Sequence, residues 1–365
     1  MTEYNIKWWV PRNGPVERKY LLEVLDRHFT NEGEYTVRFE NEIARLTGAK
    51  FAVAVTSGTV AIFLSLKALG IGHGDEVIVP DLTFIATANA VDMCGARPVL
   101  ADVETGRANI SVDSIRKLIT SRTKAIVPVH VSGRAAEMEK ILDLAAPKRI
   151  HVVEDAAEAL MSKHKGRQLG RFGISGCFSF SPAKTITTGQ GGVIITDDEE
   201  FYKKLRRLKD QGRPVRGTGG DDIHSTVGYN FKFTDLQAAA GLGQLEYLEK
   251  RISRMLRHHQ IYSKSLSGIK GFRLYKFNKG EVPQWTDAVV ERRDELDKYL
   301  KAKGIDCRRF WLPIHTQEAY RKAGSGFAGS CQASLKSLWL PSAFTHGDRE
   351  IRTVCAEIKE FFGER

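Results

Sequence analysis

The chain has 365 residues, of which 42% are hydrophobic and 27% charged, a composition that suits one large globular domain and a smaller one. No apolar run approaches the roughly 20 residues of a membrane-spanning helix. The formal net charge of +11 suits a nucleic-acid-binding protein or an enzyme that attracts an anionic small molecule. The charge alone does not distinguish these two functions. The densest basic stretch, 203–216, is typical of a solvated helix face with its following loop, and no nucleic-acid-binding motif accompanies it.

Short apolar runs alternate with helix-length segments between residues 51 and 197. The clearest helices are expected at 58–69, 85–94 and 135–146. The apolar runs predict strands at 51–57, 76–80, 97–103, 124–131, 150–155, 177–181 and 191–197. Because the runs are continuously apolar, they are typical of strands that helices cover on both faces. The sequence therefore predicts a mostly parallel seven-stranded sheet in a three-layer α/β domain.

A long helix is expected after this sheet. Thr234 and Gln237 have the spacing of a capping box, and apolar residues recur at helical spacing as far as residue 256. We expect this helix to lead from the large domain into the small one. The predicted division is a large domain with an N-terminal arm at 1–245 and a smaller α+β domain at 246–365, which ends in the amphipathic segment 348–362.

The cysteines and the N-terminal segment indicate the cellular compartment in which the protein is expected. The cysteines are scattered, odd in number and without CxxC spacing: Cys94, Cys177, Cys307, Cys331 and Cys355. The N-terminal segment is charged and interrupted by proline, unlike a signal peptide. We therefore expect a reduced, cytoplasmic protein with neither a disulfide framework nor a bound metal.

The residues that follow the strands are the first candidates for a site, because ligands of parallel sheets bind beyond the carboxyl ends of the strands. Ser57, Gly58 and Thr59 stand between a strand and a helix, where free backbone N–H groups favour an anion, although serine and threonine are also ordinary N-caps. Phe84 lies just past another strand and could stack on a planar ring or cap the core. Neither a Walker A motif nor a dinucleotide-binding motif is present.

Lys184 lies between two apolar strands, where a lysine is rarely buried without a partner. It either reaches solvent or forms a Schiff base with an aldehyde cofactor, which removes the charge and the objection to burial. Ser179 could reach the phosphate of the same cofactor, and the glycines in 189–192 allow a tight turn. Asp155 ends a buried strand as either a helix N-cap or the partner of a protonated ring nitrogen, as in pyridoxal phosphate (PLP) enzymes.

In this order, these features resemble the sugar aminotransferases of the DegT/DnrJ/EryC1/StrS family, which are PLP enzymes of fold type I, with an aspartate-aminotransferase-like fold. The resemblance covers nearly the whole chain from residue 29 onward. Its most specific parts are the lysine block "CFSFSPAKTITTGQGG" and the segment "GYNFKFTD". It implies that Lys184 binds PLP covalently, that Asp155 faces the pyridine nitrogen and that Phe84 stacks on the ring. Glu158 would lie near the ring oxygen.

The resemblance also implies a phosphate site and a shared dimer. Gly58, Thr59 and Ser179 would contact the phosphate, with Ser57 beside them in the cofactor site. Asn230 would reach the phosphate of the cofactor in the neighbouring subunit. The expected assembly is therefore a homodimer with two shared active sites.

Within the family, the chain is most similar to members that use L-glutamate to aminate C4 of a GDP-linked 4-keto-6-deoxy sugar. Arg308, Arg309 and His315, in the segment "RRFWLPIHTQEAY", could line a site for such a diphosphate sugar, which the positive net charge would attract. Alternatives are a UDP- or dTDP-linked sugar or a cyclitol as the substrate, and a non-catalytic regulator that binds PLP or a sugar nucleotide. Relatives that dehydrate sugars have histidine in place of the lysine, and Lys184 argues against that reaction.

Three positions depart from the pattern of the family. Gln190 stands where glutamate is usual. Ser132 and Arg134 replace an aromatic or aliphatic residue and a histidine or cysteine. None of the three is part of the predicted lysine and aspartate pair, so they bear on the substrate and leave the predicted chemistry unchanged.

Overall fold

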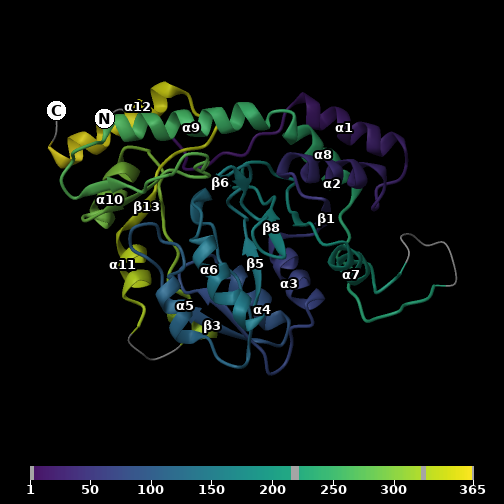
Figure 1. Cartoon of the computed structure of the whole chain (residues 1–365). Coiled ribbons are helices and arrows are strands. Elements are labelled where there is room, and N and C mark those ends of the chain that lie inside the picture. The colour runs from purple at the N-terminus through teal and green to yellow at the C-terminus, as the bar shows by residue number, and fades with distance from the viewer. Residues whose placement is uncertain (1–3, 215–221, 322–325, 364–365) are drawn as a thin grey trace.

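The structure is a computed structural model that describes residues 4–214, 222–321 and 326–363. Its largest element is a seven-stranded sheet between two layers of helices, and a four-stranded sheet follows toward the C-terminus (Figure 1). In sheet order, the seven strands are β1 (Phe51–Val55), β9 (Gly192–Thr196), β8 (Ser175–Ser179), β5 (His151–Asp155), β4 (Thr123–Ile126), β2 (Glu76–Pro80) and β3 (Arg97–Ala101). A two-stranded hairpin contains β6 (Lys163–His164) and β7 (Arg167–Gln168).

The direction of the strands confirms the predicted sheet. Strand β9 is antiparallel to both β1 and β8, and the other neighbouring pairs are parallel. The strand expected at 124–131 is shorter, since β4 ends at Ile126. Pro128 follows two residues later, and a proline has no N–H group to contribute to a sheet.

Helices cover both faces of the large sheet because successive residues of each strand point to opposite faces. On β1, Val53 and Val55 pack with α3, α4 and α7, whereas Ala52 and Ala54 pack with α2 and α8. Helices α5 and α6 cover the second face farther along the sheet. The helices of this part are α1 (Pro15–Asp26), α2 (Glu34–Thr47), α3 (Gly58–Ala68), α4 (Ala86–Met93), α5 (Val112–Leu118), α6 (Met138–Ala145), α7 (Glu199–Lys209) and α8 (Asp235–Leu245).

The prediction of one long helix after the sheet is wrong. The capping box of Thr234 and Gln237 is present and starts α8, but α8 ends at Leu245 and a separate helix, α9 (Leu248–Ser265), follows. Between them Tyr247 leaves the helical conformation, with φ −102° and ψ 3°. The break takes only two residues and includes neither glycine nor proline, so the apolar pattern continues across it.

The C-terminal part forms its own core around the four-stranded sheet β10-β11-β13-β12. In Figure 1, α9 and α12 run side by side at the top of the molecule, with the large sheet below them. The elements of this part are β10 (Phe272–Leu274), β11 (Asp287–Val290), α10 (Arg293–Ala302), β12 (Arg308–Arg309), α11 (Ala328–Lys336), β13 (Ser337–Trp339) and α12 (Asp348–Phe362). Short 3₁₀ turns lie at Val131–Gly133, Ala146–Lys148, Ile314–Thr316 and Glu318–Tyr320.

The N-terminal arm packs on the C-terminal part. Ile6 pairs with Ile305 and belongs to the C-terminal core, although we expected the arm to belong to the large domain. We propose that the two domains otherwise divide between Leu245 and Glu246, where the helix breaks. The predicted ends of the domains, residues 1–3 and 364–365, lie outside the described residues.

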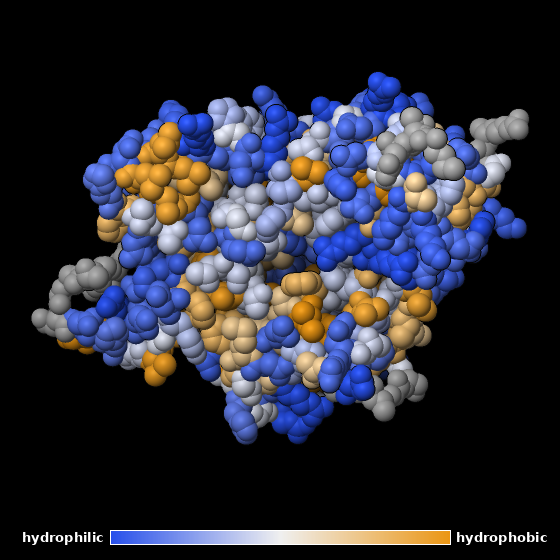
Figure 2. Space-filling model, turned by 180° about the vertical axis from the view of Figure 1, so that it is seen from behind, coloured by the Kyte–Doolittle hydropathy of each residue, from blue (hydrophilic) through white to orange (hydrophobic). Residues whose placement is uncertain are grey.

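Within the described ranges, no helix is long and apolar enough to cross a membrane. The cysteines are free, and all except Cys331 are buried. On the face shown in Figure 2, hydrophilic residues cover most of the surface and apolar residues form separate patches.

Candidate active site

A cavity of about 360 Å³ lies at the carboxyl ends of β5 and β8, where a parallel sheet is expected to bind ligands. It brings together all the residues that the sequence analysis placed around the cofactor within one subunit. They are Ser57, Gly58, Thr59, Phe84, Asp155, Glu158, Ser179 and Lys184. Segments that are more than 100 residues apart in the chain therefore meet in one small volume.

The N-terminus of α3 forms one end of the cavity. Ser57 is the N-cap, and its Oγ accepts a hydrogen bond from the N–H of Val60 at 3.2 Å. The first N–H groups of an α-helix have no acceptor within the helix, and they attract anions. A Cβ atom on Gly58 would lie 2.9 Å from the Cβ of Ser179, so a glycine is needed where α3 begins beside β8. Together with the hydroxyls of Thr59 and Ser179, this end of the cavity fits a phosphate group.

Asp155 is a buried carboxylate at the end of β5. Its Oδ2 accepts a hydrogen bond from the hydroxyl of Thr87 at 2.8 Å, and its Oδ1 accepts one from the N–H of Ala157 at 3.1 Å. Burial raises its pKa, and no described side chain forms an ion pair with it. The residues after Asp155 form turns, so it is not a helix N-cap. A protonated ring nitrogen would supply the positive charge that this carboxylate lacks.

Lys184 lines the cavity and is mostly buried, with 13% of its side chain exposed. Its Nζ lies 3.4 Å from Oε1 of Glu158 and 5.0 Å from the ring centre of Trp285. The pKa of Glu158 is raised overall, because the effect of burial is larger than the opposite effect of the nearby lysine. The alternative of a lysine that points to solvent is therefore wrong. The amine instead lies in the cavity that Asp155 and the N-terminus of α3 also line.

Phe84 is unusual among the aromatic residues at the cavity because its side chain is exposed. Its exposed fraction is 54%, whereas a residue that capped the core would be buried. It lines the cavity with Thr83, which precedes it in the chain. The exposed ring is free to cover one face of a flat heterocycle. An anion site, an unpaired carboxylate, an amine and a free aromatic ring in one cavity together fit PLP.

Of the three residues predicted to bind the substrate, only Arg308 lines the cavity. Its guanidinium carbon lies 5.0 Å from the ring centre of Trp8 and 5.5 Å from that of Trp339. Trp285 and Trp311 also line the cavity, so its outer wall is rich in tryptophan. These tryptophans were not among the predicted site residues, although the aromatic segment "RRFWLP" was an available signal for Trp311.

Arg309 and His315, unlike Arg308, do not line this cavity. Successive residues of a strand point to opposite sides, so Arg309 turns away from Arg308 and binds Asp297 at 2.9 Å. The Nδ1 of His315 lies 2.7 Å from the carboxylate of Asp81, and its ring stacks on the ring of Phe327. Both residues therefore have structural partners.

Asn230 lies outside the cavity of its own subunit. Its side-chain oxygen accepts a hydrogen bond from Nζ of Lys232 at 2.8 Å, and it is exposed. The segment before it exposes large apolar side chains, with Ile223 63% and Val227 81% exposed. This position leaves Asn230 available to a second subunit.

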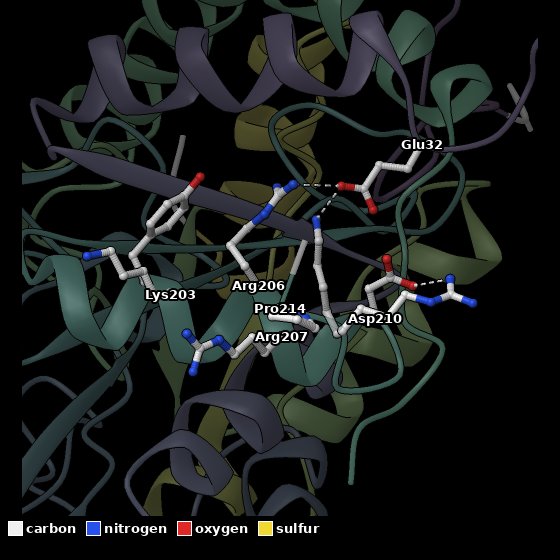
Figure 3. Close-up of a pocket in the computed structure, with 9 residues that line it drawn as sticks. Glu32, Lys203, Arg206, Arg207, Asp210 and Pro214 are labelled. Atoms are coloured by element: carbon white, nitrogen blue, oxygen red, sulfur yellow. Dashed lines mark ion pairs between the residues drawn. The ribbon is translucent and has the colours of Figure 1, made fainter. Parts of the chain in front are cut away.

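A second cavity lies along α7 and contains part of the basic stretch (Figure 3). Arg206 points toward Glu32, with an ion pair of 3.2 Å (Figure 3). Lys209 forms an ion pair with the same carboxylate at 3.1 Å. Lys209 is buried, so the prediction of a solvated helix face is only partly correct. Much of the charge of α7 is therefore compensated within the subunit. Residues 215 and 216 of this stretch lie outside the described residues.

Comparison with known proteins identifies the family. The family model described as "DegT/DnrJ/EryC1/StrS aminotransferase family" matches residues 11–359. The chain is 36% identical to a GDP-perosamine synthase of Escherichia coli O157:H7 over 96% of both chains, and 38% identical to one of Caulobacter vibrioides over 85% of both. The crystal structure of DesV of S. venezuelae, at 32% identity, superposes with a TM-score of 0.90 and covers 96% of this chain and 95% of its own. This chain belongs to the DegT/DnrJ/EryC1/StrS aminotransferase family, and its cofactor is pyridoxal 5′-phosphate.

Proposed function

We propose that this protein transfers the amino group of L-glutamate to C4 of a GDP-linked 4-keto-6-deoxy sugar, forming GDP-perosamine from GDP-4-keto-6-deoxymannose. The observation that carries the proposal is the meeting of Lys184, Asp155 and the N-terminus of α3 in one cavity. The choice of sugar is supported by three similar proteins named GDP-perosamine synthase, at 35–38% identity. The basic surplus of the chain agrees with an anionic substrate.

The residues of the cavity have distinct tasks in this reaction. When bound, PLP supplies an aldehyde carbon that carries the amino group and a ring that accepts electrons from the donor. Lys184 holds the cofactor and then moves a proton, first from Cα of glutamate and later to C4 of the sugar. Asp155 keeps the proton on the pyridine nitrogen. The N-terminus of α3, with Ser179, binds the phosphate. Glutamate leaves as 2-oxoglutarate, and the keto oxygen of the sugar leaves as water.

A second copy of the chain is part of the proposal. Asn230 is exposed outside the cavity of its own subunit, on a segment with exposed apolar side chains such as Val227. Contact with another subunit would bury these side chains and bring Asn230 to the phosphate of the partner's cofactor. We therefore propose a homodimer with two shared active sites, active in the cytoplasm.

The colour of the purified protein tests this function. The protein is expected to be yellow when PLP is bound, and L-glutamate alone should bleach it as the amino group moves to the cofactor. A panel of GDP-, UDP- and dTDP-linked 4-keto sugars should then restore the colour, with the GDP-linked sugar the most effective. If only a UDP- or dTDP-linked sugar restores the colour, that sugar is the substrate and the GDP-linked sugar is not. A yellow protein that glutamate leaves unchanged would indicate a binding protein and would contradict the aminotransferase proposal.

Arg308 is expected to bind the diphosphate of the substrate. Changing Arg308 to Gln should raise KM for the nucleotide sugar by about 10- to 100-fold, because one charge-assisted contact is lost, while KM for glutamate stays the same. Increasing salt should raise the same KM in the wild-type protein. Arg309→Gln is the matched control, since it removes the same charge one residue away, outside the cavity. Equal effects of the two variants would assign the change to net charge alone.

A further inference from the structure

The segment 281–287, which leads into β11, crosses from the C-terminal part to the cavity. Its residues are all buried, and Gln284 and Asp287 are 2% and 0% exposed. Buried amide and carboxylate groups need hydrogen-bond partners. The partners of these two side chains lie in the large domain, around Lys184 and Glu158.

Gln284 binds the peptide groups on both sides of Lys184. Its Oε1 accepts hydrogen bonds from the backbone N–H of Thr185 at 3.1 Å and from the hydroxyl of Thr185 at 2.5 Å. Its Nε2 donates to the carbonyl oxygen of Ala183 at 3.2 Å. One side chain therefore fixes the backbone immediately before and after the lysine. The next residue of the segment, Trp285, places its ring beside Nζ of Lys184, at 5.0 Å.

Asp287 supports the partner of the lysine through Ser132. The hydroxyl of Ser132 donates to Asp287 at 3.0 Å, and the backbone N–H of Ser132 donates to Glu158 at 2.8 Å. The carbonyl oxygen of Ser132 accepts from the N–H of Gln284 at 3.0 Å. Ser132 has φ 53°, a left-handed conformation that residues other than glycine rarely adopt, and these contacts hold it there.

Arg134 and Gly133 complete the junction between the two parts. Arg134 is fully buried and binds both oxygens of Asp287, at 2.7 and 2.8 Å. A Cβ atom on Gly133 would lie 2.0 Å from the carbonyl oxygen of Val282, so a glycine is required for this close approach. Ser132 and Arg134, which depart from the pattern of the family, thus bind the same carboxylate from the opposite domain.

We propose that Gln284 is a positioning residue for Lys184, whose amine it holds at the cavity by fixing the two peptide groups that flank the lysine. The inference rests on the proposed role of Lys184 as the residue that binds PLP. Because Asp287 of the same segment binds Ser132, whose N–H donates to Glu158, the C-terminal part supports both members of the Lys184–Glu158 pair.

The rate at which the apoprotein captures PLP tests this proposal. Capture joins Nζ of Lys184 to the aldehyde carbon of PLP as a C=N bond and releases water. In Gln284→Met, which keeps the size of the side chain and loses its hydrogen bonds, capture should slow by about tenfold or more, because a displaced amine reaches the aldehyde less often. Binding of pyridoxamine phosphate, which has the same ring and phosphate but no aldehyde, should be unchanged.

Gln168→Met is the matched control. Gln168 is also a buried glutamine, 3% exposed, and its amide donates to the carbonyl oxygens of Ala159 and Leu169 at 3.1 Å. Both variants should lower the melting temperature, and only Gln284→Met should slow capture. Thr185→Val, which removes one of the contacts of Gln284 and keeps the backbone bond, should slow capture less.

Each outcome has one meaning. If Gln284→Met captures PLP at the wild-type rate, or weakens pyridoxamine phosphate binding as much as it slows capture, Gln284 is only structural and the inference is wrong. If the wild-type protein captures no PLP on Lys184, the proposed function fails, and this inference fails with it. Normal capture by the wild type and by Gln168→Met with slow capture by Gln284→Met supports it.

Discussion

Lys184→Ala is expected to reduce turnover by about 10⁴-fold or more, because one amine both holds the cofactor and moves the proton at the reacting carbon. No other described lysine lines the cavity. Release of 2-oxoglutarate from glutamate measures the loss. Borohydride reduction followed by peptide mapping should find the pyridoxyl group on Lys184 in the wild type and on no peptide of the variant.

Lys203→Ala is the control for this substitution. Lys203 lies on α7, where it pairs with Glu199 and Glu200 at the surface, and its removal should leave turnover unchanged. A lysine-linked absorbance that survives in Lys184→Ala would assign the cofactor to another lysine. That result would contradict the proposed site while leaving the family assignment unaffected.

Asp155→Asn is expected to reduce kcat by about 10³-fold, because an amide cannot stabilise a proton on the pyridine nitrogen. Burial raises the pKa of Asp155, and a protonated ring nitrogen beside it would favour the ionised carboxylate again. The carboxylate and the ring therefore stabilise each other's charge. The variant should still bind PLP through Lys184 and the phosphate site, so the bound cofactor is measured together with kcat.

Asp197→Asn is the matched control for Asp155→Asn. Asp197 also follows a strand of the large sheet, but that strand, β9, is antiparallel to β8. Asp197 therefore lies at the opposite end of the strands from the cavity. It binds the N–H of Lys50 and the guanidinium of Arg171. Its substitution should affect stability and leave kcat unchanged. A loss of less than about tenfold in Asp155→Asn would show that the carboxylate does not act on the ring.

The strands and the candidate cofactor residues could be predicted because their signals are local. A continuous apolar run indicates a strand buried on both faces, and the residue after such a run lies at the carboxyl end of that strand, where ligands bind. Asp155 is selected in this way and Lys184 by its place between two such runs, and the resemblance to the family implies their roles. The broken helix at Tyr247 could not be found, since an apolar repeat looks the same whether or not two residues interrupt it.

The substrate side of the cavity shows the limit of the sequence most clearly. Arg308 and Arg309 are neighbours of the same type, yet one lines the cavity and the other binds Asp297. Which of two adjacent strand residues faces a cavity depends on the register of the strand, which its pairing with β13 fixes. For His315 the deciding feature is instead a contact with a distant segment, because its Nδ1 lies 2.7 Å from the carboxylate of Asp81.

By itself, the sequence determined the α/β architecture from short patterns of burial and turns, and its resemblance to the family implied the cofactor and the lysine proposed to bind it. Only the tertiary structure decided which charged groups remain available to a substrate and what holds the lysine in place. Gln284 is 99 residues from Thr185 in the chain, and Asp287 is 155 residues from Ser132. Contacts of this kind join segments that are distant in the chain, and no local pattern of residues records them.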